Sequence, residues 1–348
     1  MAGIYIHIPF CKQACHYCDF HFSTSLNKRD AMLGAICKEL ILRKEELTQP
    51  IETIYFGGGT PSLLTPQEID FVLQTVYDNF TVVDTPEITL EANPDDLTDA
   101  KITALASSKI NRLSIGIQSF FEEDLKLMNR AHNQTEALDC IKKAKQYFKN
   151  ISIDLMYGIP QMSPQRWQEN IEKALSLEVP HISCYVLTVE PKTALERFIK
   201  NGIIRPVDDA VAARHHAVLV EKTAAVGYHN YEFSNFCIPG WESQSNSSYW
   251  MRKPYLGVGP SAHSYDVVSR SWNVSNNPRY IKSIEKGVLP LTTEILTTEN
   301  QYNEYIMTRL RTAGGVSIDE IGAFFGLKFQ EYLKQNMQQH IALGLLIC

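Results

Sequence analysis

The chain has 348 residues, of which 44% are hydrophobic and 21% charged, and its net charge is −6. This length and apolar content are typical of one large globular domain with a smaller one, and the acidic balance argues against a nucleic-acid partner. No apolar run reaches the roughly 20 residues that span a bilayer, so any membrane contact would be peripheral. The first residues form a strand pattern instead of a signal peptide, which predicts a cytoplasmic protein.

The first two hundred residues alternate between strand and helix patterns. The predicted strands are residues 4–8, 53–56, 87–91, 112–117, 151–156 and 181–187. The predicted helices between them are residues 31–46, 66–79, 100–107, 122–128, 135–148 and 164–177. Six strand–helix units predict an α/β fold in which a parallel sheet is wound into an open, partial (β/α)6 barrel over residues 1–205. We expect the site at the carboxyl ends of its strands.

The pattern changes after residue 205. A helix is predicted over 208–226, a strand and turn over 228–236, and helices over 299–312, 317–324 and 328–342. We therefore expect an α+β extension over 206–294 and a smaller helical C-terminal domain over 295–348. The apolar end, residues 345–348, predicts either that the chain is cut short or that a terminal hairpin is missing.

Three cysteines follow the first strand directly. Cys11, Cys15 and Cys18 offer three thiolates within eight residues, which leaves one iron of a [4Fe–4S] cluster free to bind a non-protein ligand. A structural zinc site is the alternative, but zinc takes four closed ligands and no second pair of ligands follows at a suitable distance. The spacing favours the cluster.

The C-x3-C-x2-C spacing, with Tyr17 before the third cysteine, resembles the radical S-adenosylmethionine superfamily. This resemblance implies that the open iron binds the amino and carboxylate groups of S-adenosylmethionine. It also implies that one electron from the cluster cleaves that cofactor to a 5′-deoxyadenosyl radical. The protein then orients the cofactors and keeps water and oxygen away.

Polar or glycine residues stand at further predicted strand ends. Three glycines, 57–59, let the backbone approach a ligand closely, although a tight turn is the ordinary alternative. Glu91, Gln118 and Asp154 lie at the ends of apolar strands, where an unpaired polar side chain would be costly. They predict either a bound polar ligand or an internal polar network. Arg130 adds a guanidinium suited to a carboxylate.

Together these segments resemble, over nearly the whole chain, the family of oxygen-independent coproporphyrinogen III oxidase and the HemW-type heme chaperones. This resemblance implies a C-terminal segment of winged-helix type. It implies that the cluster ligands are Cys11, Cys15 and Cys18, and that the residues binding S-adenosylmethionine are Tyr5, Gly58, Gly59, Thr60, Glu91, Gln118, Arg130 and Asp154.

Two departures from the oxidases favour the chaperone branch. Phe20 stands where the oxidases carry a fourth cysteine, and the first strand starts at residue 4 without their N-terminal extension. The chaperone branch implies heme as cargo, a hemoprotein acceptor and an electron donor. The alternatives are a true oxidase that decarboxylates porphyrin propionates, or a radical enzyme acting on an unrelated substrate.

The chaperone branch also carries a His-Asn-x-x-Tyr-Trp motif associated with heme, and Ser245 replaces its histidine here. A serine hydroxyl is a poor axial ligand for heme iron. The substitute candidates are His263, His229, His215 and His216, each of which has an ordinary surface or core role as its alternative. Tyr249, Trp250 and Tyr255 are candidates to flank a porphyrin, or else packing residues.

Overall fold

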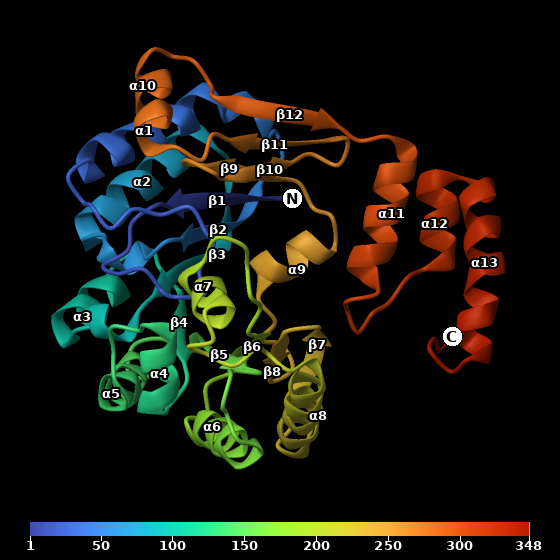
Figure 1. Ribbon diagram of the computed structural model, residues 1–348. Helices are drawn as coiled ribbons and strands as arrows, with labels where there is room; N and C mark the ends of the chain where they lie inside the picture. The colour runs from blue at the N-terminus through green and yellow to red at the C-terminus, as the bar shows by residue number, and fades with distance from the viewer. Residues whose placement is uncertain (348) are drawn as a thin grey trace.

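The computed structural model describes residues 1–347, and a single twelve-stranded sheet runs through it (Figure 1). Its centre is six parallel strands, each paired with the next along the chain. They are β1 (Ala2–Ile8), β2 (Ile51–Gly58), β3 (Val82–Ala92), β4 (Arg112–Gln118), β5 (Asn150–Tyr157) and β6 (His181–Val186). The predicted α/β class and open six-stranded barrel are therefore confirmed.

Helices cover the outer face of these strands (Figure 1). They are α1 (Arg29–Leu42), α2 (Pro66–Asn79), α3 (Asp99–Ala106), α4 (Glu122–Met128), α5 (Gln134–Ala144) and α6 (Pro164–Ser176). Capping residues fix where helices begin, as at the start of α2. The Thr65 side chain accepts a hydrogen bond from the Glu68 N–H, and the Glu68 carboxylate accepts one from the Thr65 N–H. Alternate strand residues, such as Ile4 and Ile6, are fully buried and form the core.

The chain after β6 extends the sheet at both edges. On one side β9 (Tyr255–Val258) pairs in parallel with β1, and β10 (His263–Tyr265), β11 (Ser269–Asn273) and β12 (Leu291–Ile295) follow in antiparallel order. On the other side β8 (Asn235–Cys237) and β7 (His229–Glu232) continue from β6. The helices here are α7 (Ala194–Lys200), α8 (Asp209–Ala225), α9 (Gln244–Trp250) and α10 (Asn277–Glu285). The extension is thus joined to the barrel sheet, and a domain boundary at residue 205 stays a prediction.

The C-terminal part is helical, as predicted, and lies to one side of the sheet (Figure 1). It comprises α11 (Thr298–Arg309), α12 (Ile318–Phe325) and α13 (Leu327–Ala342), around a small core of Tyr302, Tyr305 and Ile321. Backbone hydrogen bonds join it to the β7–β8 hairpin: the Phe233 N–H donates to Arg311 O, and the Ala313 N–H donates to Tyr231 O, both at 2.9 Å. The expectation for residues 345–348 includes Cys348, which lies outside the described residues.

Two differences from the predicted elements have physical reasons. The predicted helix 31–46 ends at Leu42, and a 3₁₀ turn (Lys44–Glu46) follows, because the buried Arg43 guanidinium turns to bind both Glu39 and Glu46. Strands β9–β12 were not predicted, since strands of only three to five residues carry little periodicity. Among residues 1–347, no helix combines the length and apolarity needed to cross a bilayer.

Candidate functional site at the cysteine loop and barrel lumen

The cysteine loop between β1 and α1 is fixed by backbone hydrogen bonds to distant segments. The Cys11 N–H donates to Ser23 O, and the His16 N–H donates to Met128 O, both at 3.1 Å. The Asn129 side chain donates to Ala14 O at 2.8 Å from a left-handed backbone position. These contacts hold the three cysteines, all half-buried, at the carboxyl end of the parallel strands. The loop is therefore positioned by the barrel and not by its own sequence alone.

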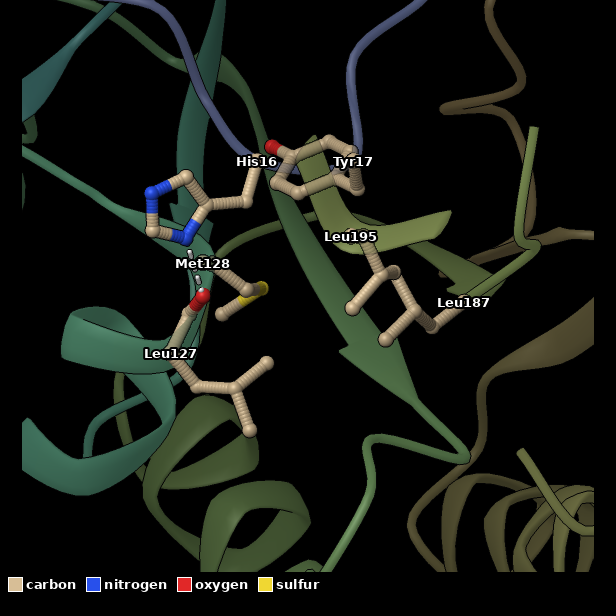
Figure 2. Close-up of a pocket in the computed structure, with 6 residues that line it drawn as sticks. All are labelled: His16, Tyr17, Leu127, Met128, Leu187 and Leu195. Carbon is tan, nitrogen blue, oxygen red and sulfur yellow. Dashed lines mark hydrogen bonds between the residues drawn. The ribbon is translucent and has the colours of Figure 1, made fainter. Parts of the chain in front are cut away.

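An apolar floor lies under this loop (Figure 2). Tyr17 packs over Leu195, and the group encloses no space large enough for a water molecule. The His16 Nδ1–H donates to Leu127 O at 2.8 Å, which anchors the loop to the end of α4. Tyr17, the residue before the third cysteine, therefore belongs to a closely packed apolar group that leaves no room for water on this side of the loop.

The thiols have a strongly perturbed environment. Burial raises the pKa of Cys11 to about 11, although the Thr60 hydroxyl lowers it part of the way, and burial raises the pKa of Cys18 to about 12. Both thiols are protonated at neutral pH unless a bound metal displaces the protons.

A half-buried cation lies beside one of these thiols. Arg130 Nη1 lies 3.4 Å from Cys15 Sγ, while its Nη2 donates to Asn93 Oδ1 at 2.7 Å and to Gly116 O at 2.8 Å. The guanidinium of Arg130 is thus tied to the strand ends beside the cysteines and favours negative charge there. Three thiols with a fixed positive neighbour fit an anionic iron–sulfur cluster.

The three glycines at the end of β2, of which Gly59 directly follows the strand, are explained first by packing within the protein. A Cβ on Gly59 would lie 2.6 Å from Phe10 O, and one on Gly58, whose φ is +103°, would lie 2.5 Å from the His7 ring. The Gly59 and Thr60 N–H groups donate to Ile8 O at 2.9 Å and Phe10 O at 2.7 Å. The glycines therefore let β2 close tightly against the start of the cysteine loop.

Two carboxylates predicted from strand ends meet inside the barrel. Glu91 accepts a hydrogen bond from Tyr55 Oη at 2.8 Å, and Asp154 accepts one from Ser114 Oγ at 3.3 Å. Burial, with a contribution from Asp154, raises the pKa of Glu91 to about 7. Burial also raises the pKa of Asp154 to about 6, against the opposing charge of Arg112. Asp154 lies three residues before the end of β5, so its expected place at a strand end was wrong.

Gln118 occupies a special backbone position at the end of β4. It has a left-handed φ of 66°, where the register of β4 and β5 shifts. Gly116 makes room for it: a Cβ at 116 would lie 3.0 Å from the Gln118 amide nitrogen and 3.2 Å from the Arg130 guanidinium. A non-glycine residue held in this conformation is typical of functional sites.

The structure adds lumen residues that the sequence analysis did not select. Alternate positions of the central strands, on the same face as Tyr5, Glu91 and Asp154, carry further polar residues: His7, Thr53, Tyr55, Glu87, Thr89, Arg112, Ser114, Ser152, His181 and Ser183. Arg112 Nε is buried without a hydrogen-bond partner among the described residues. This two-residue alternation within the strands was the available signal.

A cavity of about 360 Å³ opens between the cysteine loop, β1, α9 and the β9–β10 edge. Aromatic and imidazole side chains dominate its walls: Tyr5, His7, Asp19, Phe20, His21, Gly58, Tyr249, Tyr255, Ser261 and His263. Phe20 is 66% exposed at its rim. The predicted residues Tyr5, Gly58, Tyr249, Tyr255 and His263 therefore meet in one place.

The three cavity histidines differ in their partners. His7 uses both ring nitrogens, toward Tyr5 Oη at 3.2 Å and His21 O at 2.9 Å, and burial lowers its pKa to about 4. His21 Nε2 lies 2.7 Å from Asn277 Oδ1. His263 stacks on Trp272 and makes no side-chain hydrogen bond within residues 1–347. His263 is thus the cavity imidazole with both nitrogens free.

The other heme candidates lie away from the cavity walls. His215 and His216 pack against Trp167 and Phe233, and His229 lies beside Cys237 and Glu242. The replaced motif position, Ser245, is 2% exposed, and its N–H donates to Glu87 at 3.0 Å.

Comparisons with known proteins agree with this architecture. The model of the radical SAM superfamily matches residues 5–174, and that of the HemN C-terminal domain matches residues 296–347. The heme chaperone HemW of Bacillus subtilis is 36% identical over 331 residues, which cover 94% of this chain and 87% of that protein. The heme chaperone HemW of Mycobacterium tuberculosis (strain H37Rv) is 33% identical over 328 residues, 92% of this chain and 84% of that protein.

Among solved structures, coproporphyrinogen III oxidase (HemN) from Escherichia coli, described as a radical SAM enzyme, has the same fold. Its TM-score is 0.83 at 21% identity, with 99% of this chain and 83% of that chain covered. The relatives at 36% and 33% identity are matched over more than four-fifths of their own length. The chain therefore belongs to the HemW family of radical SAM proteins.

Proposed function

We propose that this protein binds heme and delivers it to acceptor hemoproteins in the cytoplasm. The observation that carries the proposal is the cavity of about 360 Å³, which joins an aromatic, imidazole-containing wall to the rim of the cysteine loop. A flat, apolar ring with a metal at its centre is recognised by such walls together with one free imidazole. The names of the relatives, heme chaperones, support the same cargo.

We further propose that Cys11, Cys15 and Cys18 hold a [4Fe–4S] cluster and that S-adenosylmethionine binds beside it. Tyr5, Gly58, Gly59, Thr60, Glu91, Gln118, Arg130 and Asp154 would surround that cofactor. When both are bound, the cluster supplies the electron that cleaves the sulfonium, and an external electron donor is then required. Arg130 Nη1, 3.4 Å from Cys15 Sγ, would stabilise the negative charge of the thiolates.

The lumen carboxylates would orient the cofactor. Glu91 on β3 and Asp154 on β5 are half-buried on either side of β4, and Tyr55 and Ser114 each donate a hydrogen bond to one oxygen of them. Their remaining lone pairs suit the hydroxyl and ammonium groups of S-adenosylmethionine. A bound ammonium would favour their ionised forms and lower both raised pKa values. The apolar floor around Tyr17 would keep water from this side of the site.

For heme, the proposed axial ligand is His263. Its ring is exposed toward the cavity and held by stacking on Trp272, with 5.9 Å between ring centroids. Tyr249 and Tyr255, in edge-to-face contact at 4.7 Å, would line one side of the porphyrin. The cavity is open to solvent at its rim, where Phe20 is exposed, and this suits a heme that must be released to an acceptor.

The test is a heme transfer assay beside an oxidase assay. Anaerobically reconstituted protein is titrated with heme and then mixed with an apo-cytochrome whose Soret band differs. We expect binding and transfer, weakened in His263→Ala and unchanged in His340→Ala, which alters an exposed histidine on α13. With coproporphyrinogen III, S-adenosylmethionine and reductant, we expect no protoporphyrinogen IX. Multiple turnovers to that product would overturn the chaperone proposal in favour of the oxidase.

A further inference from the structure

A second cluster of metal-ligating side chains lies outside the cysteine loop, at the β7–β8 edge of the sheet. His229 and Cys237 are directly opposite each other in the antiparallel ladder, so their side chains share one face. Glu242 comes from the loop that leaves β8 toward α9. The hairpin register and this loop therefore bring together an imidazole, a thiol and a carboxylate.

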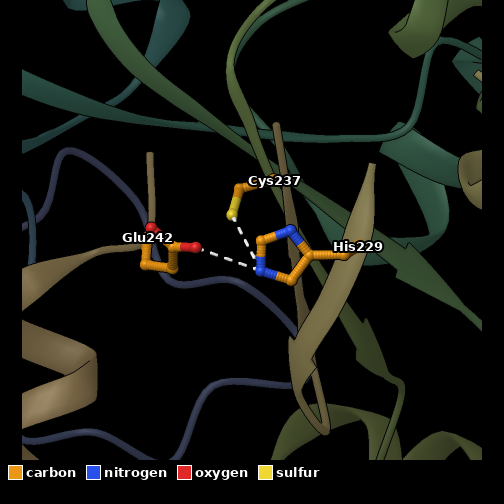
Figure 3. Close-up of side chains that lie close together, drawn as sticks. All are labelled: His229, Cys237 and Glu242. Atoms are coloured by element: carbon orange, nitrogen blue, oxygen red, sulfur yellow. Dashed lines mark hydrogen bonds and ion pairs between the residues drawn. The ribbon is translucent and has the colours of Figure 1, made fainter. Parts of the chain in front are cut away.

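The three ligand atoms are close enough to share one ion. His229 Nε2 lies 3.1 Å from Glu242 Oε1 and 4.0 Å from Cys237 Sγ, and all three atoms lie within 4.8 Å of one another (Figure 3). With zinc–ligand bonds of about 2.0–2.3 Å, tetrahedral geometry separates ligand atoms by roughly 3.3–3.7 Å. Small side-chain rotations would bring the cluster to that spacing.

The backbone of the loop prepares this arrangement. Gly240 has a φ of +88°, a left-handed conformation that glycine adopts without strain, and the Trp241 N–H donates to Ile238 O at 3.0 Å. The Gly240 N–H also donates to Glu242 Oε1 at 3.4 Å. The turn thus folds Glu242 back onto the hairpin.

We propose that His229, Cys237 and Glu242 bind a divalent transition-metal ion, preferably Zn²⁺, with a fourth position left for water. The thiol proton would pass to solvent, so that a thiolate, a carboxylate and a neutral imidazole balance the charge of the cation. A sulfur and a nitrogen ligand select zinc over magnesium or calcium. The His229 and Glu242 side chains are 40% and 37% exposed, which gives the ion an entry path.

The ion would fasten the loop that leads into α9. Ser243 caps α9, and the N–H groups of Gln244 and Ser245 hold the Glu87 carboxylate at the barrel lumen. A zinc ion bound through Glu242, just before these residues, would therefore restrict the motion of the start of α9, the helix that carries Tyr249.

The experiment measures zinc and iron per chain in the cluster-loaded protein after equilibration with Zn²⁺ and gel filtration. We expect one tightly held zinc in the wild type, with affinity at least about tenfold weaker in His229→Asn, Cys237→Ser and Glu242→Gln. Cys140→Ser is the matched control, since that buried thiol has its own partner, Ala137 O at 3.2 Å, and should keep the zinc.

Iron content should be the same in all these variants, which separates this site from the cysteine loop. Because Cys237 is fully buried, Cys237→Ser can fail to fold, so the half-exposed His229→Asn provides the second measurement. Zinc should raise the melting temperature of the wild type and not of His229→Asn. Equal zinc affinity in wild type and His229→Asn, or no zinc in the wild type, would overturn the proposal.

Discussion

The cysteine loop and the neighbouring cavity are built in opposite ways. All three thiols come from eight consecutive residues, and backbone hydrogen bonds hold that loop against the barrel. The cavity walls come from β1, the loop, α9, β9 and β10, so its residues range from Tyr5 to His263 along the chain. A local motif therefore supplies all the ligands of the first region, which the barrel then positions, whereas the residues of the second region come together only after the sheet has formed. Substitutions of the loop cysteines should accordingly abolish cluster binding. Substitutions in the lumen and the cavity should only weaken the binding of S-adenosylmethionine or heme.

The largest expected effect is loss of the cluster. Cys11→Ala/Cys15→Ala should lower iron from about four per chain to none after anaerobic reconstitution, because one thiolate cannot hold the cluster. Iron and sulfide analysis measures this. Cys140→Ala, which removes a buried thiol outside the loop, should retain the cluster. A double variant that kept four irons would contradict the cluster assignment.

Substitution of the lumen carboxylates should weaken cofactor binding without abolishing it. Glu91→Ala and Asp154→Ala should each weaken S-adenosylmethionine binding by about 1.5–3 kcal/mol, the contribution of a hydrogen bond to a charged group. Calorimetry on reconstituted protein measures the affinity, and iron content should not change. Ser152→Ala, on the same strand as Asp154, serves as the control. If both carboxylate variants bound the cofactor normally, these side chains would be an internal polar network only.

Substitutions at the cavity should change heme affinity by a smaller amount. They also test whether the heme ligand is the residue that strand pairing brings to the cavity. His263→Ala should weaken heme binding about tenfold, or ~1.4 kcal/mol, and change the Soret band, because the iron loses its imidazole. Ser245→His should change the spectrum less, since position 245 is a buried position within α9 that does not line the cavity. A Soret band that sharpened in Ser245→His and stayed unaltered in His263→Ala would reverse the ligand assignment.

The smallest effect concerns stability without ligands. The pKa of Glu91 is raised to about 7 in the folded protein against the ordinary 4.5, so its contribution to stability is complete below pH 4.5 and is lost as the pH rises through 7. Glu91→Gln should therefore stabilise the ligand-free protein by about 1 kcal/mol at pH 8 and by less at pH 5, since residual solvent access reduces the full effect. Urea unfolding at the two pH values measures this. An equal effect at both would show that Glu91 does not titrate in this range.

The sequence by itself determined the six central strands, most of the helices around them, the cysteine loop and the family. These features rest on periodicities and spacings within short windows, where side-chain direction follows directly from position along a strand or helix. The polar residues at every second position of β3, β4 and β5 were also present in the sequence, and only Glu91, Gln118 and Asp154 were selected from them.

Only the tertiary structure decided the rest. The pairing of β9 with β1, across some 250 residues of chain, places Tyr255 and His263 at the rim of the cysteine loop. The β7–β8 register places His229 opposite Cys237, a relation that neither residue's neighbours indicate. Which of ten histidines is free to bind a metal depends on which others have found hydrogen-bond partners. Long-range strand pairing decides which side chains become neighbours, and the residues adjacent in sequence do not determine that pairing.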